Sequence, residues 1–475
     1  MKWYINCLVL ITISLPVAAI ELPDIGSSAN LVMSLADEQK LGTSFFRQLR
    51  LQVELIEDPQ VNDYINNLGY RLASYSHKPE QQFKFFVIKD PAINAFAVPG
   101  GFIGVNSGLI LKTRNEAELA SVLAHEIAHV TQRHIARSVA ASKRMSLPMM
   151  AGLLVGLVAG LANPAIAHAA VMSVMAGNIQ LQINFTRSHE KEADRVGIET
   201  LAKAGFDTRY MPIFFQRLQI ASRLYDNVPE FLRTHPVTTD RIAESRDRAE
   251  QYPRKREQDT PFYHLMKAKV LALTSENHKK LLKQLKTMLK TKQFHDERAI
   301  RYAIAETALS RGLLNQVKIQ LNWLLKYDQD RAIYSLLQAQ LEWLKKKRVK
   351  AASLYDEALK TYPGNIMIGL DYAEKLLQHK QSRKAKRVLL RLAADNNPYY
   401  YSLLSRAYQL NNEKAQSHLA LSDWYYLMGK TRLALEQVNF ANKYKADYYL
   451  KARIKMRHKI LEAEWQEEQQ MKEKY

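Results

Sequence analysis

The segment HEIAHVTQRH, residues 125–134, places three histidines and one glutamate within ten positions. Because a helix turns by about 100° per residue, His125 and His129 share one face, with Glu126 beside them. His134 follows His125 by nine residues, a rotation of roughly 180° in an unbroken helix, so we expect its ring to point away. A helix that ended early would let a later histidine reach the same metal. That arrangement needs a glycine at position 132 and a histidine at position 135, which are glutamine and isoleucine here. The segment therefore predicts two metal ligands, and a third must lie elsewhere.

The spacing of these two histidines suits zinc. Two imidazoles one helical turn apart reach a single ion, and zinc prefers nitrogen and oxygen donors in tetrahedral geometry. A glutamate next to the first histidine can take a proton from zinc-bound water. The same pentad also occurs by chance in unrelated helices, but here the neighbouring residues are apolar, so the polar side chains would be buried without partners. The pattern favours His125 and His129 as ligands and Glu126 as general base.

The segment FTRSHEKEADRVGIETL, residues 185–201, holds the best candidates for the third ligand. It is a predicted helix that can pack against the first one. Glu190 and Asp194 share a face at positions i and i+4, so one carboxylate can bind zinc while the other orients a ligand histidine. His189 and Glu192 lie on other sides of this helix. The residues alone favour Glu190 and leave His189 open.

The surrounding chain predicts the elements that position these side chains. Residues 83–89 alternate like a strand, and a Pro-Gly-Gly turn divides the next apolar run. Asn115 can cap the helix that carries the histidines. Helices are predicted at 34–77, 115–138, 187–205 and 208–226, and strands at 83–89 and within 93–110.

No Asp, Glu, Lys or Arg occurs between residues 145 and 186. Asn163 and Pro164 divide this uncharged stretch into two apolar arms, each too short to cross a bilayer alone. We expect either a helical hairpin that is buried or packed on itself, or a loop that enters a membrane or covers the site.

Residues 1–19 have the pattern of a secretory signal peptide: one lysine, an apolar run and small residues at the cleavage site. The apolar run is shorter than the ~20 residues that a membrane span requires. Cys7, the only cysteine of the chain, lies within this run. The exported protein would therefore have no disulfide and no thiol ligand, so a metal must use nitrogen and oxygen donors.

The chain carries a formal net charge of +21. Such a surface attracts acidic partners. An exported protein meets little nucleic acid, and no aromatic-basic nucleic-acid motif is present, so we expect no nucleic-acid partner. Anionic lipid or lipopolysaccharide at a membrane surface is the favoured partner, and a solvated basic face without a dedicated partner is the alternative.

The chain repeats beyond the polar, proline-bearing stretch 251–260. Small residues recur with a period of 34, at Ala305, Ala339 and Ala373 and, one helix later, at Ala351 and Ala385. Gly312 falls where a turn between helices is expected, and Gly429 has the matching place in a final unit, 421–441. The pattern resembles tetratricopeptide repeats, in which small residues stand where paired helices approach closely. We predict an α+β, mostly α fold: a metallopeptidase domain with a small β-sheet over 20–252, then an all-α superhelix of repeats over 253–475.

HExxH followed by ExxxD, in the form HEKEADRVG, resembles the zinc metallopeptidase family that contains HtpX and the CAAX prenyl endopeptidases. The signal peptide, the segments INAFAVPGGFIGVNSGL and ASVLAHEIAHVTQRH, and the repeats are similar to its periplasmic β-barrel assembly-enhancing type over nearly the whole chain. The resemblance implies one zinc ion bound by His125, His129 and Glu190, with Glu126 as general base and Asp194 as supporting acid. The chain lacks the clear full-length transmembrane helices of the prenyl-protease branch, which argues against a membrane-embedded prenyl substrate.

The segment FLRTHPVTTDRI, residues 231–242, contains His235 followed by Pro236. It resembles a short His-Pro segment that lies near the zinc in this family, where the histidine can occupy the open position of the metal. The alternative is an ordinary histidine in a surface loop.

The resemblance also implies a function. We expect a periplasmic zinc endopeptidase whose repeats recruit misassembled or stalled outer-membrane β-barrel proteins and contact their assembly machinery. An edge strand is expected to pair with extended substrate; it comprises Asn94, Ala95, Phe96, Ala97 and Val98. The rival from another class is a chaperone or assembly scaffold with a mostly closed zinc site, in which the repeats do the work.

Overall fold

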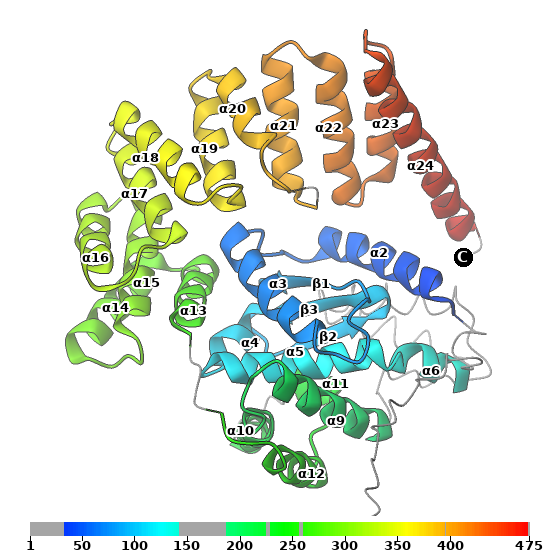
Figure 1. Cartoon of the computed structure of the whole chain (residues 1–475), viewed down its shortest axis with the longest axis vertical. Coiled ribbons are helices and arrows are strands. Elements are labelled where there is room, and N and C mark those ends of the chain that lie inside the picture. Colours follow the sequence, from blue (N-terminus) through cyan, green and yellow to red (C-terminus); the bar gives the residue numbers. More distant parts are fainter. Residues whose placement is uncertain (1–32, 142–186, 225–228, 256–259, 395, 474–475) are drawn as a thin grey trace, which may run out of the picture.

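The computed structural model describes residues 33–141, 187–224, 229–255, 260–394 and 396–473. Helices dominate these residues, and one small sheet lies in the N-terminal half, which confirms the mostly α, α+β class (Figure 1). The signal peptide and the uncharged stretch 145–186 lie outside the described residues, so both interpretations stay predictions. In the described part of the chain, no helix combines the length and the apolar character that a membrane crossing requires.

Two helices occupy the segment predicted to be helical over 34–77. Helix α2 (Leu35–Gln52) begins at Ser34, whose hydroxyl accepts a hydrogen bond from the Asp37 N–H while the Asp37 carboxylate accepts one from the Ser34 N–H. Helix α3 (Pro59–Ala73) begins after Asp58, whose carboxylate caps its first turn. The break follows from Asp58-Pro59, because proline lacks an N–H and suits the first position of a new helix.

The sheet contains β1 (Lys84–Ile88), β2 (Ala95–Val98) and β3 (Phe102–Asn106), in the order β1-β3-β2. Strand β1 runs parallel to β3, whereas β2 is antiparallel to it. The one-turn helix η1 (Pro99–Gly101) joins β2 to β3, and Gly100 and Gly101 both adopt a φ of 80°, which glycine tolerates without strain. The predicted strands are therefore present, and β2 is an edge strand.

The helix predicted over 115–138 is two helices. Helix α5 (Glu116–Thr131) is capped by the Asn115 side chain, as expected, and α6 (His134–Ala141) starts after a break at Arg133, which has a φ of 52°. The other helices of this domain are α4 (Ser107–Lys112), α9 (Arg187–Lys203), α10 (Tyr210–Leu224), α11 (Glu230–Thr234) and α12 (Thr239–Glu250). The short helix α11 ends directly before His235 and Pro236.

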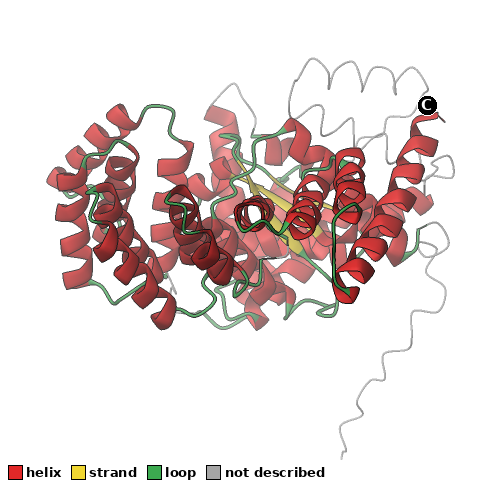
Figure 2. Cartoon of the chain, turned by 90° about the horizontal axis from the view of Figure 1, so that it is seen from above, coloured by secondary structure: helices red, strands yellow, loops and turns green. Residues whose placement is uncertain are grey.

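The C-terminal half is a row of paired helices that curves around the N-terminal domain (Figures 1 and 2). All five alanines at the 34-residue period have no exposed surface, which is what close helix contacts require. The helices are α13 (Pro261–Thr274), α14 (His278–Thr291), α15 (Glu297–Ser310), α16 (Leu314–Tyr327), α17 (Ala332–Leu344), α18 (Arg348–Thr361), α19 (Ile366–Gln378), α20 (Ser382–Leu389), α21 (Pro398–Leu410), α22 (Lys414–Leu427), α23 (Thr431–Asn442) and α24 (Tyr448–Glu473).

The repeats contact the N-terminal domain at both ends of this curve. Near its start, the hydroxyl of buried Tyr263 donates to the Thr113 carbonyl at 2.8 Å. Near its end, Arg47 on α2 forms ion pairs with Glu464 and Glu468 on α24, at 3.1 and 3.3 Å. The predicted boundary between residues 252 and 253 falls in the connection between α12 and α13, where the chain leaves one set of packed helices for the other.

Candidate metal centre

Four side chains from three segments meet in one buried cluster. His125 and His129 come from α5, Glu190 comes from α9, and His235 directly follows α11. Each contributes a nitrogen or oxygen atom, and these atoms all lie within 4.8 Å of one another. No side chain of the four is more than 3% exposed.

The cluster has the short distances of a ligand set. The Nε2 atoms of His125 and His129 are 3.0 Å apart. Glu190 Oε2 lies 3.5 Å from His125 Nε2, and Glu190 Oε1 lies 3.5 Å from His129 Nε2. His235 Nδ1 lies 3.0 Å from Glu190 Oε1 and 3.4 Å from His125 Nε2. Three imidazoles and one carboxylate that converge in this way fit a divalent cation, because nitrogen and oxygen donors pointing at one another repel unless a cation or proton lies between them.

The charges of the cluster support the same conclusion. Burial opposes protonation of His125, but its hydrogen bonds with Asp194 and Glu190 outweigh that effect and raise its pKa to about 9. Burial and the positive charge of His125 lower the pKa of His129 well below its usual value. Burial alone would raise the pKa of Glu190, but the neighbouring histidines, His235 first, hold it well below the usual range. Without a metal, the cluster therefore holds a positive charge on protonated His125, and a metal ion would take the place of that charge.

Asp194 and Arg241 contact two of the ligand residues, His125 and Glu190. The Asp194 carboxylate lies 2.9 Å from His125 Nδ1, the nitrogen that faces away from the other ligands. The guanidinium of Arg241 donates to both Asp194 oxygens, at 2.8 and 2.9 Å, and lies 2.7 Å from Glu190 Oε2. A carboxylate behind a ligand histidine fixes the tautomer and orientation of its ring.

Sequence reasoning missed Arg241. The residue is 2% exposed and is one of the largest fully buried side chains of the described residues. The only signal in the sequence is its place six residues after His235, and its Nη1 donates to the Pro236 carbonyl at 2.8 Å. Nothing in the sequence links it to residues 190–194, because the pairing depends on how α12 packs against α9.

Glu126 lies beside the cluster, next to His235. Its side chain is fully buried, and neither carboxylate oxygen accepts a well-formed hydrogen bond from the described residues. Its Oε1 is 3.5 Å from His235 Nε2. Burial raises its pKa, which the charges of His235 and His125 partly oppose. A buried carboxylate with a raised pKa suits the transfer of protons near neutral pH.

Comparison with known proteins shows the family to which the chain belongs. Residues 59–249 match peptidase family M48, and residues 344–407 match a tetratricopeptide repeat. The chain is 33% identical to the β-barrel assembly-enhancing protease of Escherichia coli (strain K12) over 425 residues, which cover 89% of this chain and 87% of that protein. The chain belongs to the M48 metallopeptidases.

Two other relatives match shorter parts of this M48 metallopeptidase. A putative β-barrel assembly-enhancing protease of Vibrio cholerae is 42% identical over 270 residues, so the match spans only 56% of either chain. The mitochondrial metalloendopeptidase OMA1 of Schizosaccharomyces pombe is 29% identical over 179 residues, 38% of this chain and 50% of that protein. The M48 family implies a divalent metal, and the buried cluster of three histidines and Glu190 provides donors for one.

His134 of this M48 metallopeptidase lies beside the cluster, so the expectation that its ring points away is wrong. Its Nδ1 lies 2.8 Å from His129 Nδ1, and its Nε2 lies 3.2 Å from Glu192 Oε2. The rotation of roughly 180° assumed an unbroken helix, whereas the chain turns at Arg133 before α6 begins. His134 still stays outside the four-residue ligand cluster, as expected.

The other candidates for the third ligand are separated by their contacts. Glu190 lies in the cluster, whereas the ring of His189 stacks on that of His134, with centroids 4.5 Å apart and planes at 14°. Glu192 pairs with Arg137 at 2.8 Å and with His134. His189, which the residues alone left open, and Glu192 therefore both lie outside the ligand cluster that contains Glu190.

Strand β2 of the M48 metallopeptidase passes next to Glu126. The Asn106 N–H donates to the Asn94 carbonyl at 2.9 Å, and these residues lie opposite each other when the β2–β3 register is extended by one pair. Hydrogen-bonded pairs alternate along antiparallel strands, so Phe96 and Val98 also bond to β3, while the backbone groups of Ala95 and Ala97 face the free edge. The Ala97 backbone is also close enough to Glu126 to lower the pKa of that carboxyl.

Proposed function

We propose that this metallopeptidase is a periplasmic, zinc-dependent endopeptidase that acts on misassembled or stalled outer-membrane β-barrel proteins. The observation that carries the proposal is the buried set of His125, His129 and Glu190 with Glu126 beside it. The pattern of residues 1–19 supports export, and the name of the Escherichia coli relative supports this class of client.

The spacing of the donor atoms supports zinc. Tetrahedral zinc with bonds of ~2.0–2.1 Å places its donors roughly 3.3 Å apart. Five pairs of donor atoms in the cluster are separated by 3.0 to 3.5 Å. The donors are imidazole nitrogens and one carboxylate, with no thiolate, as in the catalytic zinc sites of other peptidases. We assign one zinc ion to the chain, held by His125, His129 and Glu190.

The surrounding residues suit hydrolysis of a peptide bond. Bound zinc supplies Lewis-acid chemistry, which polarises a carbonyl group and lowers the pKa of water. Glu126 takes the proton from the attacking water and returns it to the leaving amine. Asp194 acts as the supporting acid, since it holds His125 in the tautomer that leaves Nε2 free.

Strand β2 would hold the substrate. The backbone groups of Ala95 and Ala97 pair with an extended segment as a neighbouring strand would, and they place it beside Glu126. The predicted edge strand runs from Asn94 to Val98. A client pairs with it only through a strand that is itself unpaired, so unfolded clients are selected over folded ones. An unassembled β-barrel protein exposes such segments.

The repeats would recruit these clients and contact the assembly machinery. Their curve around the catalytic domain keeps a bound client near the cluster (Figure 1). The net charge of +21 supports a further contact with an anionic membrane surface or lipopolysaccharide.

His235 would act as a fourth ligand and gate. Its Nδ1 belongs to the donor cluster, so His235 would take the place that a catalytic zinc site otherwise keeps for water. Its ring stacks on Phe231 with centroids 4.9 Å apart, and Pro236 restricts the backbone that follows. With His235 in that place, the site would be closed and Glu126 would have no water to activate.

This closed cluster also favours the second candidate function, a chaperone or assembly scaffold with a rarely active site. Pull-down from cells that produce the Glu126→Gln chain separates the two. The endopeptidase predicts intact β-barrel clients with this variant and fewer clients, or fragments, with the wild type. Equal capture of intact clients by both chains would favour the scaffold.

A further inference from the structure

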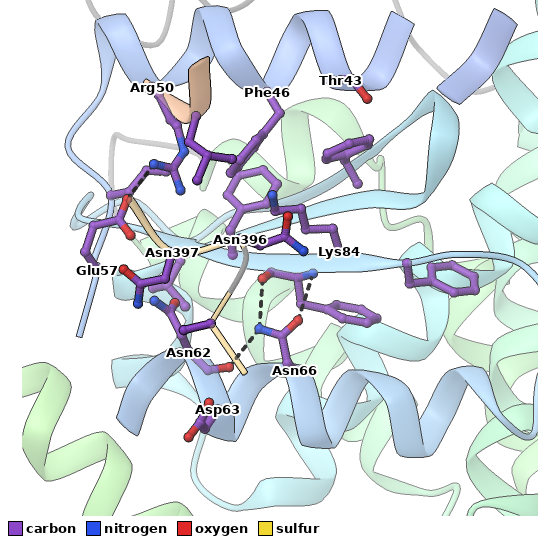
Figure 3. A pocket seen from close by; sticks show the side chains of 18 of the residues that line it. Thr43, Phe46, Arg50, Glu57, Asn62, Asp63, Asn66, Lys84, Asn396 and Asn397 are labelled. Carbon is purple, nitrogen blue, oxygen red and sulfur yellow. Dashed lines mark hydrogen bonds and ion pairs between the residues drawn. The ribbon is translucent and has the colours of Figure 1, made fainter. Parts of the chain in front are cut away.

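A second cleft lies between the catalytic domain and the repeats, with a volume of about 730 Å³. Helices α2 and α3 form its sides, β1 runs between them, and Asn396 and Asn397 before α21 lie across it (Figure 3). None of the residues of the metal cluster lines it. Its volume is within the roughly 300–1,000 Å³ of typical ligand sites.

One part of the cleft has an excess of positive charge. Lys84 has no carboxylate within ion-pair distance among the described residues, and its ammonium group lies 4.3 Å from the centre of the Phe46 ring. Burial, followed by the charge of nearby Arg50, lowers the pKa of Lys84 to about 8. The side chain of Arg50 is only 7% exposed, pairs with Glu57 at 3.1 Å, and has an Nε without a hydrogen-bond partner. Glu57 therefore pairs with Arg50, and no carboxylate of the described residues forms an ion pair with Lys84.

The rest of the cleft suits a polypeptide backbone. The outer edge of β1 is held by side chains of α3: the Asn66 amide accepts from the Phe85 N–H at 3.3 Å and donates to the Phe85 carbonyl at 3.2 Å. Tyr70 donates to the Phe83 carbonyl at 3.2 Å. Amide groups both donate and accept, as a backbone does, and four of them line the cleft. Asn66 already bonds to Phe85, and the Asn397 oxygen caps α21, so Asn62 and Asn396 are the amides offered to a bound segment.

Aromatic side chains line the space between the charged part and the amides. They provide apolar surface for the side chains of a bound segment, and their rings are rigid, so little conformational entropy is lost on binding. They are Phe46, Tyr70, Phe83, Phe86 and Phe102.

We propose that this cleft binds an extended polypeptide segment whose acidic side chain lies against Lys84 and Arg50 and whose apolar side chains contact the aromatic rings. The charge excess argues for a carboxylate, and the amide side chains argue for a backbone. The proposal rests on the proposed function only in taking the segment to belong to an unfolded client. It makes the cleft a docking site separate from β2, lined by both the catalytic domain and the repeats.

Binding of two labelled peptides tests the proposal. The probes are a short fluorescein-labelled peptide of alternating Thr and Phe with one central Glu, and the same peptide with Gln in that place. Fluorescence anisotropy is measured with the full chain carrying Glu126→Gln, which prevents cleavage. We expect the Glu peptide to bind about tenfold more tightly, equivalent to about 1.4 kcal/mol, because its carboxylate makes a charge-assisted contact that the Gln amide lacks.

Lys84→Met should remove the preference for the Glu peptide, whereas Lys89→Met should retain it. Lys89 is the matched control, because it directly follows β1, pairs with Glu54 at 2.8 Å and does not line the cleft. Equal affinity for the two peptides, or the same loss in both variants, would overturn the proposal.

A second variant guards against misfolding of the Lys84 chain. Asn396 is exposed, so Asn396→Cys followed by a bulky maleimide should block the cleft from the side of the repeats. The only native cysteine, Cys7, lies in the predicted signal peptide, so the label is specific. Unchanged binding of the Glu peptide after labelling would contradict the proposal. Casein cleavage by the labelled chain with Glu126 intact reports on the metal site separately, and a loss there alone would count against the proposed function instead.

Discussion

His134 Nδ1 lies 2.8 Å from the Nδ1 of His129, the nitrogen of that ring that faces away from the metal cluster. One of the two nitrogens must donate the shared proton, which fixes the tautomer of each ring. Glu192, 3.2 Å from His134 Nε2, favours a proton on that nitrogen, so His134 Nδ1 accepts and His129 Nδ1 donates. His129 Nε2 is then unprotonated and directed at the cluster. His134 therefore fixes the tautomer and orientation of the His129 ring, as Asp194 fixes those of the His125 ring.

His134→Ala should weaken metal binding about 10- to 100-fold, the usual effect of losing a partner behind a metal ligand. Competition with a chromophoric chelator measures this affinity. His278→Ala, far along the chain in the repeats, is the matched control and should bind the metal as the wild type does. Equal affinities of the two variants would mean that His134 only fills space.

Glu190→Gln should lose most of the bound metal, whereas Glu192→Gln should keep it. Both changes remove one charge from the same helix, but only Glu190 has an oxygen in the cluster. Glu192 acts through His134 and Arg137. Metal content after dialysis, measured by atomic emission, distinguishes them. The same content in both variants would show that the third ligand is wrongly assigned.

Metal binding should release a proton from His125. The hydrogen bonds that His125 donates to Asp194 and Glu190 outweigh its burial and raise its pKa to about 9, so at pH 7 the metal-free ring is protonated and must lose that proton to bind. The apparent affinity should rise about tenfold per pH unit up to about pH 9 and level off above it. Calorimetric titration in buffers of different ionisation enthalpy counts the protons. No proton released at pH 7 would contradict this assignment.

His235→Ala should raise the cleavage of peptides while metal stays bound by the remaining three ligands. The reason is that the fourth position becomes available to water. If His235 instead donates a hydrogen bond to the reacting carbonyl oxygen, activity should fall. The sign of the change, measured with a fluorogenic peptide, separates these roles. Unchanged activity would reject both.

The sequence predicts most elements of the catalytic domain because their signals are local. The Pro-Gly-Gly turn between β2 and β3 needs positive φ at two glycines, and the cap at Asn115 needs only the residues that follow it. The buried alanines at the 34-residue period are equally local, since each marks a contact between consecutive helices.

The break at Arg133 depends on contacts that the sequence does not reveal. A non-glycine residue in the left-handed region costs about 1–2 kcal/mol, so a helix is expected to continue there. Arg133 adopts φ 52° because its guanidinium is held by Glu38 at 2.8 Å and by the Met33 carbonyl at 2.6 Å, a hundred residues earlier. The position of His134 follows from this tertiary contact. The role of Arg241 could not be predicted for the same reason, because its partners Asp194 and Glu190 lie on another helix.

The proposed hydrolysis depends most on Glu126, as the group that activates water at the cluster of His125, His129 and Glu190. The decisive measurement is the rate of casein cleavage by purified Glu126→Gln protein, with metal content and thermal unfolding recorded on the same sample. We predict that cleavage falls below detection while metal content and the unfolding temperature stay at wild-type values, because Glu126 is no metal ligand and glutamine has the same shape. Cleavage at the wild-type rate by this variant, or by wild-type protein freed of metal with a chelator, would contradict the account.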